Sequence, residues 1–162
     1  MALPPVPAAP TLSEATSGDA TRFYVSLNGS TWVEIAELDD EDGLTDLPSG
    51  EQSTYETTHM GSGKFKEWKK NKRVDGAETD ITGNLVFGSE SLTTLRAIEE
   101  SSDAVQYLIV LPQGDETWHA TGSALFHSLR LSNPGAEVRQ FTITAKWVTE
   151  MTLAEEVVGG GV

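Results

Sequence analysis

The chain has 162 residues and a formal net charge of −14, with 25 acidic side chains against 11 lysines and arginines. This acidic excess argues against a protein that grips nucleic acid, because affinity for phosphate depends on clustered basic side chains that displace counterions. Without cysteine the chain has no disulfides or thiolate metal ligands. The lack of a membrane-length apolar run or a signal-peptide pattern predicts a single soluble domain.

The first 38 residues divide into an arm and a hairpin. Residues 1–20 open with four prolines in ten residues and hold little apolar material, which predicts a flexible N-terminal arm or one that orders only against a neighbouring copy. In residues 21–38, apolar side chains alternate up to Asn28 and Gly29, a pair suited to a type I′ turn.

An acidic run follows the hairpin and is made of Asp39, Asp40, Glu41 and Asp42. Adjacent carboxylates repel one another, so a solvated loop is the favoured interpretation. A Ca²⁺ loop is the alternative, although the EF-hand spacing is absent. Residues 53–59 are rich in threonine and predict an exposed or edge strand.

The charge then inverts within residues 61–76, which glycines at both ends predict to be a long loop between strands. Basic side chains alternate there with two aromatic ones: Lys64, Phe65, Lys66, Trp68, Lys69, Lys70, Lys72 and Arg73. Such a mixture can bind nucleic acid, or can simply be solvated. The favoured interpretation is that the loop docks on an acidic surface of another copy, with Phe65 and Trp68 as buried anchors.

The next two elements are a strand and a helix. Residues 79–87 predict a strand with Ile81, Leu85 and Phe87 on one side and Gly83 as a candidate bulge. Residues 89–102 predict an amphipathic helix. Its apolar stripe is Leu92, Leu95 and Ile98, and its wet side carries Glu90, Glu99 and Glu100.

Three strand-like runs complete the core of the prediction. Residues 105–111 are dense in β-branched and aromatic side chains, and residues 117–131 place Leu125, Leu129 and Leu131 on one face. In the third run Phe141, Ile143, Ala145 and Trp147 face inward, and Gln140, Thr142, Thr144 and Lys146 face outward. With one helix on a sheet, the fold class is a β-rich α+β sandwich or barrel spanning residues 21–152, followed by a flexible tail at 153–162.

Catalytic chemistry is not expected from this sequence. The three histidines, His59, His119 and His127, belong to no metal-binding or nucleophile motif, and no phosphate-binding glycine loop follows a strand. The carboxylates are scattered over loops, where solvation keeps them ordinary. We therefore predict no enzyme activity, no catalytic residues, no cofactor and no metal.

The order of these segments resembles the major tail (tail tube) proteins of long-tailed phages and gene transfer agents. The resemblance covers residues 21–149 and lies in the succession of STWVEIAEL, an acidic loop, STYETTH, the basic loop, TDITGNLVF, one helix, VQYLIVLPQGDETWHATGSALFHSLRL and FTITAKWV. It implies a tail-tube-type sheet, rings of six copies joined through strand edges, and stacking of rings through the long loop. Compared with the pattern of that family, the long loop of this chain is unusually basic.

The resemblance also implies partners and a location. A tail-tube protein is a homo-oligomer in the virion tail, is made in the host cytoplasm, and meets a tape measure, a tail initiator and a terminator. DNA would pass through the bore without specific binding, along acidic and threonine-rich faces that do not hold phosphate. The run Asp39–Asp42 would be the acidic counterpart of the basic loop.

The alternative is a free-standing β-sandwich binding or decoration module of a virion. In that interpretation Trp32, Trp118 and Trp147 would form a stacking platform, for example for carbohydrate. The opposing interpretation of these tryptophans places them in the core or in an interface.

Overall fold

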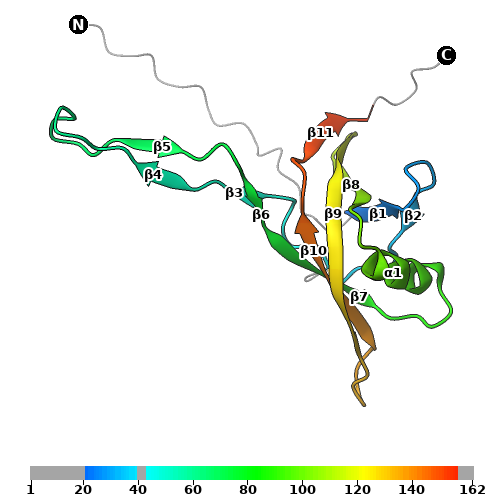
Figure 1. Cartoon of the computed structure of the whole chain (residues 1–162). Coiled ribbons are helices and arrows are strands. Elements are labelled where there is room, and N and C mark those ends of the chain that lie inside the picture. The colour runs from blue at the N-terminus through cyan, green and yellow to red at the C-terminus, as the bar shows by residue number, and fades with distance from the viewer. Residues whose placement is uncertain (1–20, 40–42, 157–162) are drawn as a thin grey trace, which may run out of the picture.

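The three strand-like runs near the C-terminus form the centre of the sheet. The computed structural model describes residues 21–39 and 43–156. In it β8 (Val105–Gln113), β9 (Glu116–Ser132) and β10 (Gln140–Trp147) pair antiparallel in chain order (Figure 1). These strands form because β-branched and aromatic residues alternate with polar ones, so each strand buries one face.

Four further strands complete a curved antiparallel sheet in the described part of the chain. β1 (Arg22–Ser26) pairs with β8, β2 (Val33–Glu34) with β1, β7 (Glu78–Asn84) with β10, and β11 (Thr152–Glu155) with β9. The order is β2-β1-β8-β9-β10-β7, with β11 beside the N-terminal half of β9. β11 extends the ordered chain past residue 152, so the predicted start of the flexible tail is wrong.

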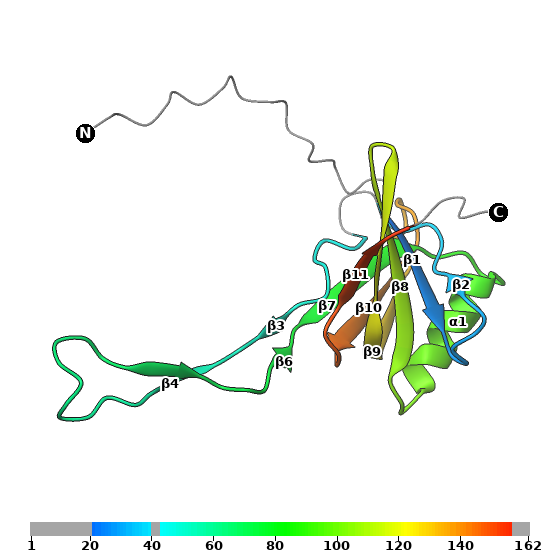
Figure 2. The same ribbon diagram turned by 90° about the horizontal axis from the view of Figure 1, so that it is seen from above.

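One helix covers the core face of the sheet (Figure 2). α1 (Glu90–Glu100) begins after Ser89, whose side chain accepts a hydrogen bond from the Leu92 amide at 3.2 Å, as an N-cap residue does. The predicted stripe of Leu92, Leu95 and Ile98 is buried. The helix and the sheet therefore enclose the core expected from the sequence.

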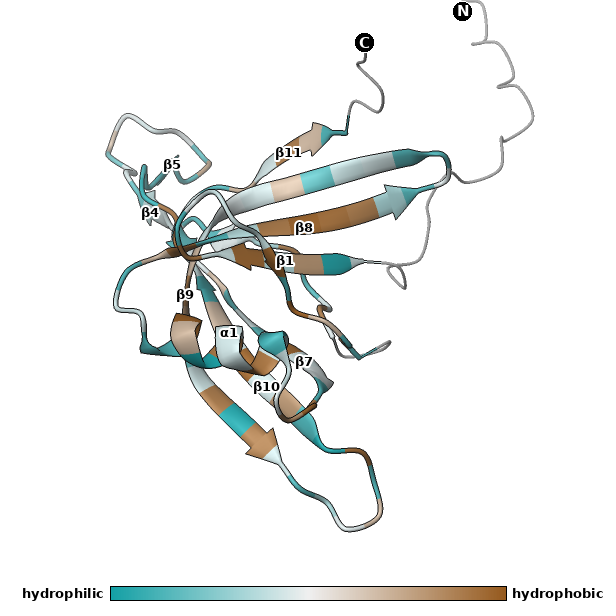
Figure 3. Ribbon diagram, turned by 90° about the vertical axis from the view of Figure 1, so that its right-hand side faces the viewer, coloured by the Kyte–Doolittle hydropathy of each residue, from teal (hydrophilic) through white to brown (hydrophobic). Residues whose placement is uncertain are grey.

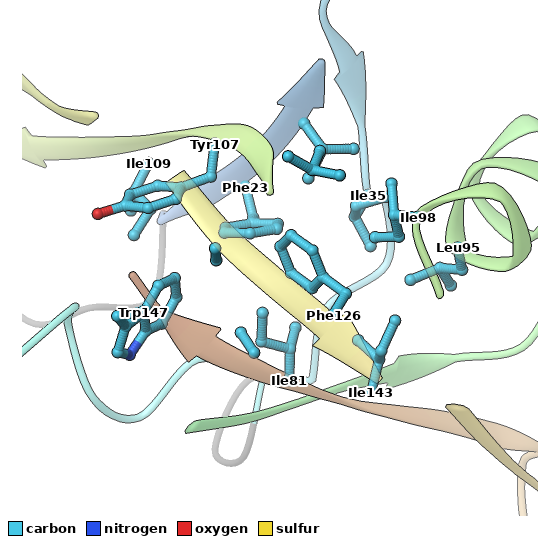
Figure 4. Packing of buried hydrophobic residues seen from close by; sticks show 14 of the residues in the cluster. Phe23, Ile35, Ile81, Leu95, Ile98, Tyr107, Ile109, Phe126, Ile143 and Trp147 are labelled. Carbon is cyan, nitrogen blue, oxygen red and sulfur yellow. The ribbon is translucent and has the colours of Figure 1, made fainter. Parts of the chain in front are cut away.

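Aromatic rings fill the middle of this core (Figure 4). Tyr107 stacks on Phe23 with 6.4 Å between ring centroids and meets the edge of Trp147 at 5.0 Å, and Phe126 packs against Phe23. The apolar stretches of β1 and β8 are visible as brown segments in Figure 3. The predicted inward residues of β10 are all buried: Phe141, Ile143, Ala145 and Trp147.

The leucines of β9 do not share one face as predicted, because the strand contains a β-bulge. Ser128 has a φ of 59°, and the register with β10 shifts between Thr142 and Thr144. The extra residue inverts the alternation. Leu125 is consequently exposed and Leu129 packs against the core, so the two do not share a face.

The bulge also explains why Glu99 does not simply face water. Its carboxylate accepts a hydrogen bond from the backbone amide of Leu129, which follows the bulge. A bulge leaves one strand residue outside the regular ladder, and its polar groups then need another partner. Glu99 supplies that partner from the helix.

Several local predictions need correction. Only Gly29, with a φ of 80°, is left-handed in the β1–β2 turn, so this is not the type I′ turn, which needs two such residues. Gly83 is not in a bulge. Because glycine has no side chain, the Glu37 carbonyl and the Phe141 ring can approach it closely. Phe87 is exposed, and the predicted outward Thr144 is buried, with its hydroxyl donating to Asp80 at 2.7 Å.

Candidate functional site

The most prominent feature outside the core is a long two-stranded arm that leaves the sheet at the start of β7 (Figures 1 and 2). Its root is β3 (Gly50–Glu51) paired with β6 (Asp75–Gly76), and its outer part is β4 (Thr54–Glu56) paired with β5 (Trp68–Lys70). The predicted loop at residues 61–76 is therefore wrong in part, because β5 and β6 lie within it and pair with β4 and β3. The predicted strand within residues 53–59 is present as β4.

The arm carries large apolar side chains that contact little of the chain. Phe65 is 86% exposed and Trp68 57% exposed, and Tyr55 and Met60 are exposed as well. A two-stranded hairpin is only marginally stable alone in water. Exposed aromatic rings on such a ribbon make it a candidate interaction surface.

The two faces of the arm differ in composition. Trp68 lies opposite Glu56, and Lys70 lies opposite Thr54, so these four side chains share a face. Lys66 belongs to the same face, since its ammonium group lies 3.6 Å from the Glu56 carboxylate. We call this set the Trp68 face. The other face carries Tyr55 opposite Lys69.

Most basic side chains of the arm have no carboxylate beside them in the described structure. The lysine in an ion pair is Lys66, and His59 lies 3.6 Å from Glu67. The remaining predicted contact residues make no ion pair with the described residues: Lys64, Lys69, Lys70, Lys72 and Arg73. Their charge is available to a partner.

Of the predicted acidic counterpart the structure describes Asp39, which lies on the body of the chain. The Asp39 carboxylate accepts a hydrogen bond from the side-chain amide of Gln140 at 3.2 Å. The backbone amide of Asp39 donates to the Thr82 carbonyl of β7. Asp40, Glu41 and Asp42 lie outside the described residues. Asp39 is therefore placed beside β7, whereas the basic residues lie along the arm.

A groove at the root of the arm was not found by sequence reasoning. We call it the root groove; its volume is about 660 Å³. It forms because β10 and β11 both pair with β9, and the intervening residues 148–151 loop out beside β3 and β6. Its apolar wall contains Pro48, Val74, Trp147, Val148 and Met151, and its charged groups are Asp75, Lys146 and Glu150.

Two backbone contacts fix the root of the arm against β10. The Trp147 amide donates to the Ala77 carbonyl at 3.2 Å. A Cβ on Gly76 would lie 1.7 Å from the Trp147 carbonyl oxygen, so only glycine allows this approach. Gly76 is the sequence signal that points to this close approach, although in the sequence alone it indicates only the end of a loop.

The sheet face opposite the core carries paired charges. Its arginines and lysine, Arg22, Arg130 and Lys146, each have a carboxylate within 4.0 Å. On the same face His127 lies 3.4 Å from Glu78, and His119 lies 3.6 Å from Glu156. These exposed pairs add little stability, but they leave no cluster of unpaired cations among the described side chains of this face.

The three tryptophans of the alternative interpretation do not form a platform. Trp147 is buried in the core, and its indole nitrogen donates to the Thr79 hydroxyl at 3.0 Å. Trp32 and Trp118 lie on different strands or loops of the sheet. Separately, the described residues contain no helix that is both long and apolar enough to span a membrane.

The fold was compared with known proteins. No protein-family model matches the sequence, and no curated protein shows significant sequence similarity to it. Solved structures do match. A chain in the tail of an empty gene transfer agent particle, solved with C6 symmetry, has a TM-score of 0.66 at 15% identity and covers 86% of this chain and 99% of its own.

Two further structures agree with this match. A chain of the six-fold symmetrised anti-feeding prophage baseplate has a TM-score of 0.62 at 14% identity and covers 91% of this chain and 97% of its own. The SPP1 tail tube chain has a TM-score of 0.60 at 10% identity, and the match covers 88% of this chain and 81% of the SPP1 chain. The chain has the tail-tube fold. The predicted β-rich fold with one helix on the sheet is thereby confirmed, and the tail-tube fold accounts for nearly the whole described chain.

Proposed function

We propose that the chain is the subunit of a tail tube in a phage-like virion or gene transfer agent. Copies assemble into rings of six, the rings stack, and DNA passes through the bore. The observation that carries this proposal is the extent of the tail-tube fold, which covers 86% to 91% of the chain in structures of tail and baseplate particles. The six-fold symmetry stated for two of those particles supports the copy number.

The open strand edges support assembly within a ring. β2 pairs over two residues only, and β11 is exposed along its length and pairs with β9 on one side. Exposed edges are templates for pairing with another chain, and closing a barrel across subunits removes them. The β7 edge differs, because Leu38 and Leu44 bridge to it. Growth of the ring therefore uses the β2 and β11 sides.

The arm supports assembly between rings. Its aromatic and basic side chains differ in kind from the acidic body of the subunit, which suits a head-to-tail contact. Head-to-tail contacts that do not close give open filaments. Phe65 and Trp68 act as anchors, and the lysines and Arg73 direct the approach to carboxylates on the body of the next copy.

The charge-paired face of the sheet suits the bore. Arg22, Arg130 and Lys146 are each matched by a carboxylate, and threonines lie between the charged residues. Phosphates bind where unmatched cations cluster, so DNA would slide along this face without adhering. The remaining partners in this proposal are the tape measure, initiator and terminator of the tail, and the site of action is the virion.

Electron microscopy and sedimentation of the concentrated protein test the proposal. The expected result is tubes with a six-fold end view, formed above a critical concentration or after a tail initiator is added. A chain that stays monomeric at high concentration with its tail partners present would contradict the proposal. It would favour the free-standing virion module instead.

A further inference from the structure

We propose that the root groove is the receptor for the arm of another copy, and that Trp68 enters it. This inference rests on the proposed function and assigns the surface that receives the arm. The competing receptor is the predicted acidic counterpart, of which Asp39 lies beside β7. The two assignments differ in which residues of the body contact the Trp68 face.

The apolar surfaces match in kind. The groove wall of Val74, Val148 and Met151 is apolar, and Val148 is 44% exposed. Pockets of roughly 300–1,000 Å³ hold drug-sized molecules, so a groove of about 660 Å³ accommodates an indole. Trp68 is an exposed indole on the arm, and burial of such a ring in a pocket is typical of interface anchors.

The charges around the two surfaces also match. On the Trp68 face, Lys70 lies two residues from Trp68 and has no carboxylate partner among the described residues. In the groove, Glu150 is exposed and makes no ion pair with the described residues, whereas Asp75 is held by Lys146 at 3.1 Å. An inserted Trp68 therefore brings Lys70 to the free carboxylate of Glu150.

The occupant must come from another copy. Trp68 is eight residues from Gly76 along the returning limb of the arm, through β5 and β6, which spans up to about 26 Å when extended. The ribbon runs outward from its root (Figure 2), and the bonds between β4 and β5 hold it extended. An arm that cannot reach its own root but fits the root of a neighbour makes a head-to-tail contact that repeats without closing.

Cysteine cross-linking tests the contact without background, because the native chain has no cysteine. Thr54 lies opposite Lys70 on the Trp68 face, whereas Thr57 lies opposite Glu67 on the other face. The test pair is Thr54→Cys with Val148→Cys, and the matched control is Thr57→Cys with Val148→Cys. Tubes assembled under reduction are treated with a short bis-maleimide and analysed on denaturing gels.

The expected result is a ladder of covalent multimers from the Thr54 pair and none from the Thr57 pair. Equal ladders, or a ladder from Thr57 alone, would overturn the assignment. So would cross-linking of Thr54→Cys to Asp42→Cys in place of Val148→Cys. Tubes without a Thr54–Val148 cross-link would refute the groove while leaving the proposed function intact, whereas absence of tubes from the native chain would refute both.

A charge exchange gives a second readout that needs no cysteine. Lys70→Glu and Glu150→Lys each raise the critical concentration for tube formation about tenfold, and the double variant restores it to within about threefold. Lys69→Glu combined with Glu150→Lys is the control, because Lys69 lies on the other face. Rescue by Lys69→Glu but not by Lys70→Glu would overturn the assignment.

Discussion

The hydroxyl of Tyr107 lies buried near Trp147, with 5.0 Å between the two rings, and no hydrogen bond satisfies it in the described structure. Gly122 makes room for it, since a Cβ there would lie 2.5 Å from the hydroxyl oxygen. A buried polar atom without a partner costs about 1–3 kcal/mol. The core thus contains one polar group that destabilises it.

The first prediction concerns removal of that hydroxyl. Tyr107→Phe should raise the free energy of unfolding by about 1 kcal/mol, because the ring contacts stay and the unsatisfied atom is lost. Chemical denaturation of the monomer measures the difference. Tyr55→Phe, at an exposed position on the arm, is the matched control and should change nothing. A destabilised Tyr107→Phe would mean that the hydroxyl has a partner in solution.

The second prediction concerns alkaline pH. Burial raises the pKa of the Tyr107 phenol from 10.0 to about 12, because the folded core disfavours its anion. The associated stability is fully present below pH 10 and is lost as the pH rises towards 12. The native chain should therefore lose more stability than Tyr107→Phe between these values. Parallel pH dependences of unfolding for the two proteins would count against the prediction.

The third prediction concerns the bulge in β9. Glu99→Ala should lower the free energy of unfolding by about 1.5–3 kcal/mol, because the Leu129 amide loses a charged acceptor. Glu100→Ala, one residue later and exposed, is the control and should stay within about 0.5 kcal/mol of the native value. Equal effects of the two substitutions would show that helix charge, rather than the bulge contact, is responsible.

The fourth prediction concerns the charge of the arm. Combined reversal of Lys69, Lys70 and Lys72 to Glu should abolish stacking while leaving the melting temperature of the monomer unchanged, since these side chains contact nothing in the core. The triple Lys→Arg variant keeps the charge and should still form tubes. Electron microscopy and thermal unfolding give the two readouts. Long tubes from the Glu variant would disprove a role for arm charge.

The sequence predicted elements whose signals are local. The alternation at Phe141, Ile143 and Trp147 and the helical stripe of Leu92, Leu95 and Ile98 determine which side chains are buried, and both predictions are confirmed. Local patterns reflect burial, and burial is what organises these strands and this helix.

Features created by distant contacts could not be predicted. The amide of Leu129, which follows the bulge at Ser128, bonds to a carboxylate 30 residues away on the helix. The strand β5 has no apolar alternation that would mark it in the sequence. It is defined by its cross-strand bonds alone. The root groove exists because Gly76 meets the end of β10, about 70 residues later in the chain. The basic and aromatic character of the arm follows directly from the sequence, whereas the root groove does not.

Trp147 links the arm to the interior of the subunit. Its indole is held by Thr79 and Tyr107, while its main chain is bonded to Ala77 and pressed against Gly76. Tension on the arm is therefore transmitted directly to the aromatic core around Trp147. In the proposed tube, a pull strong enough to free the arm must first disturb the aromatic core, so the folding stability of each subunit would set the mechanical strength of its contact with the next.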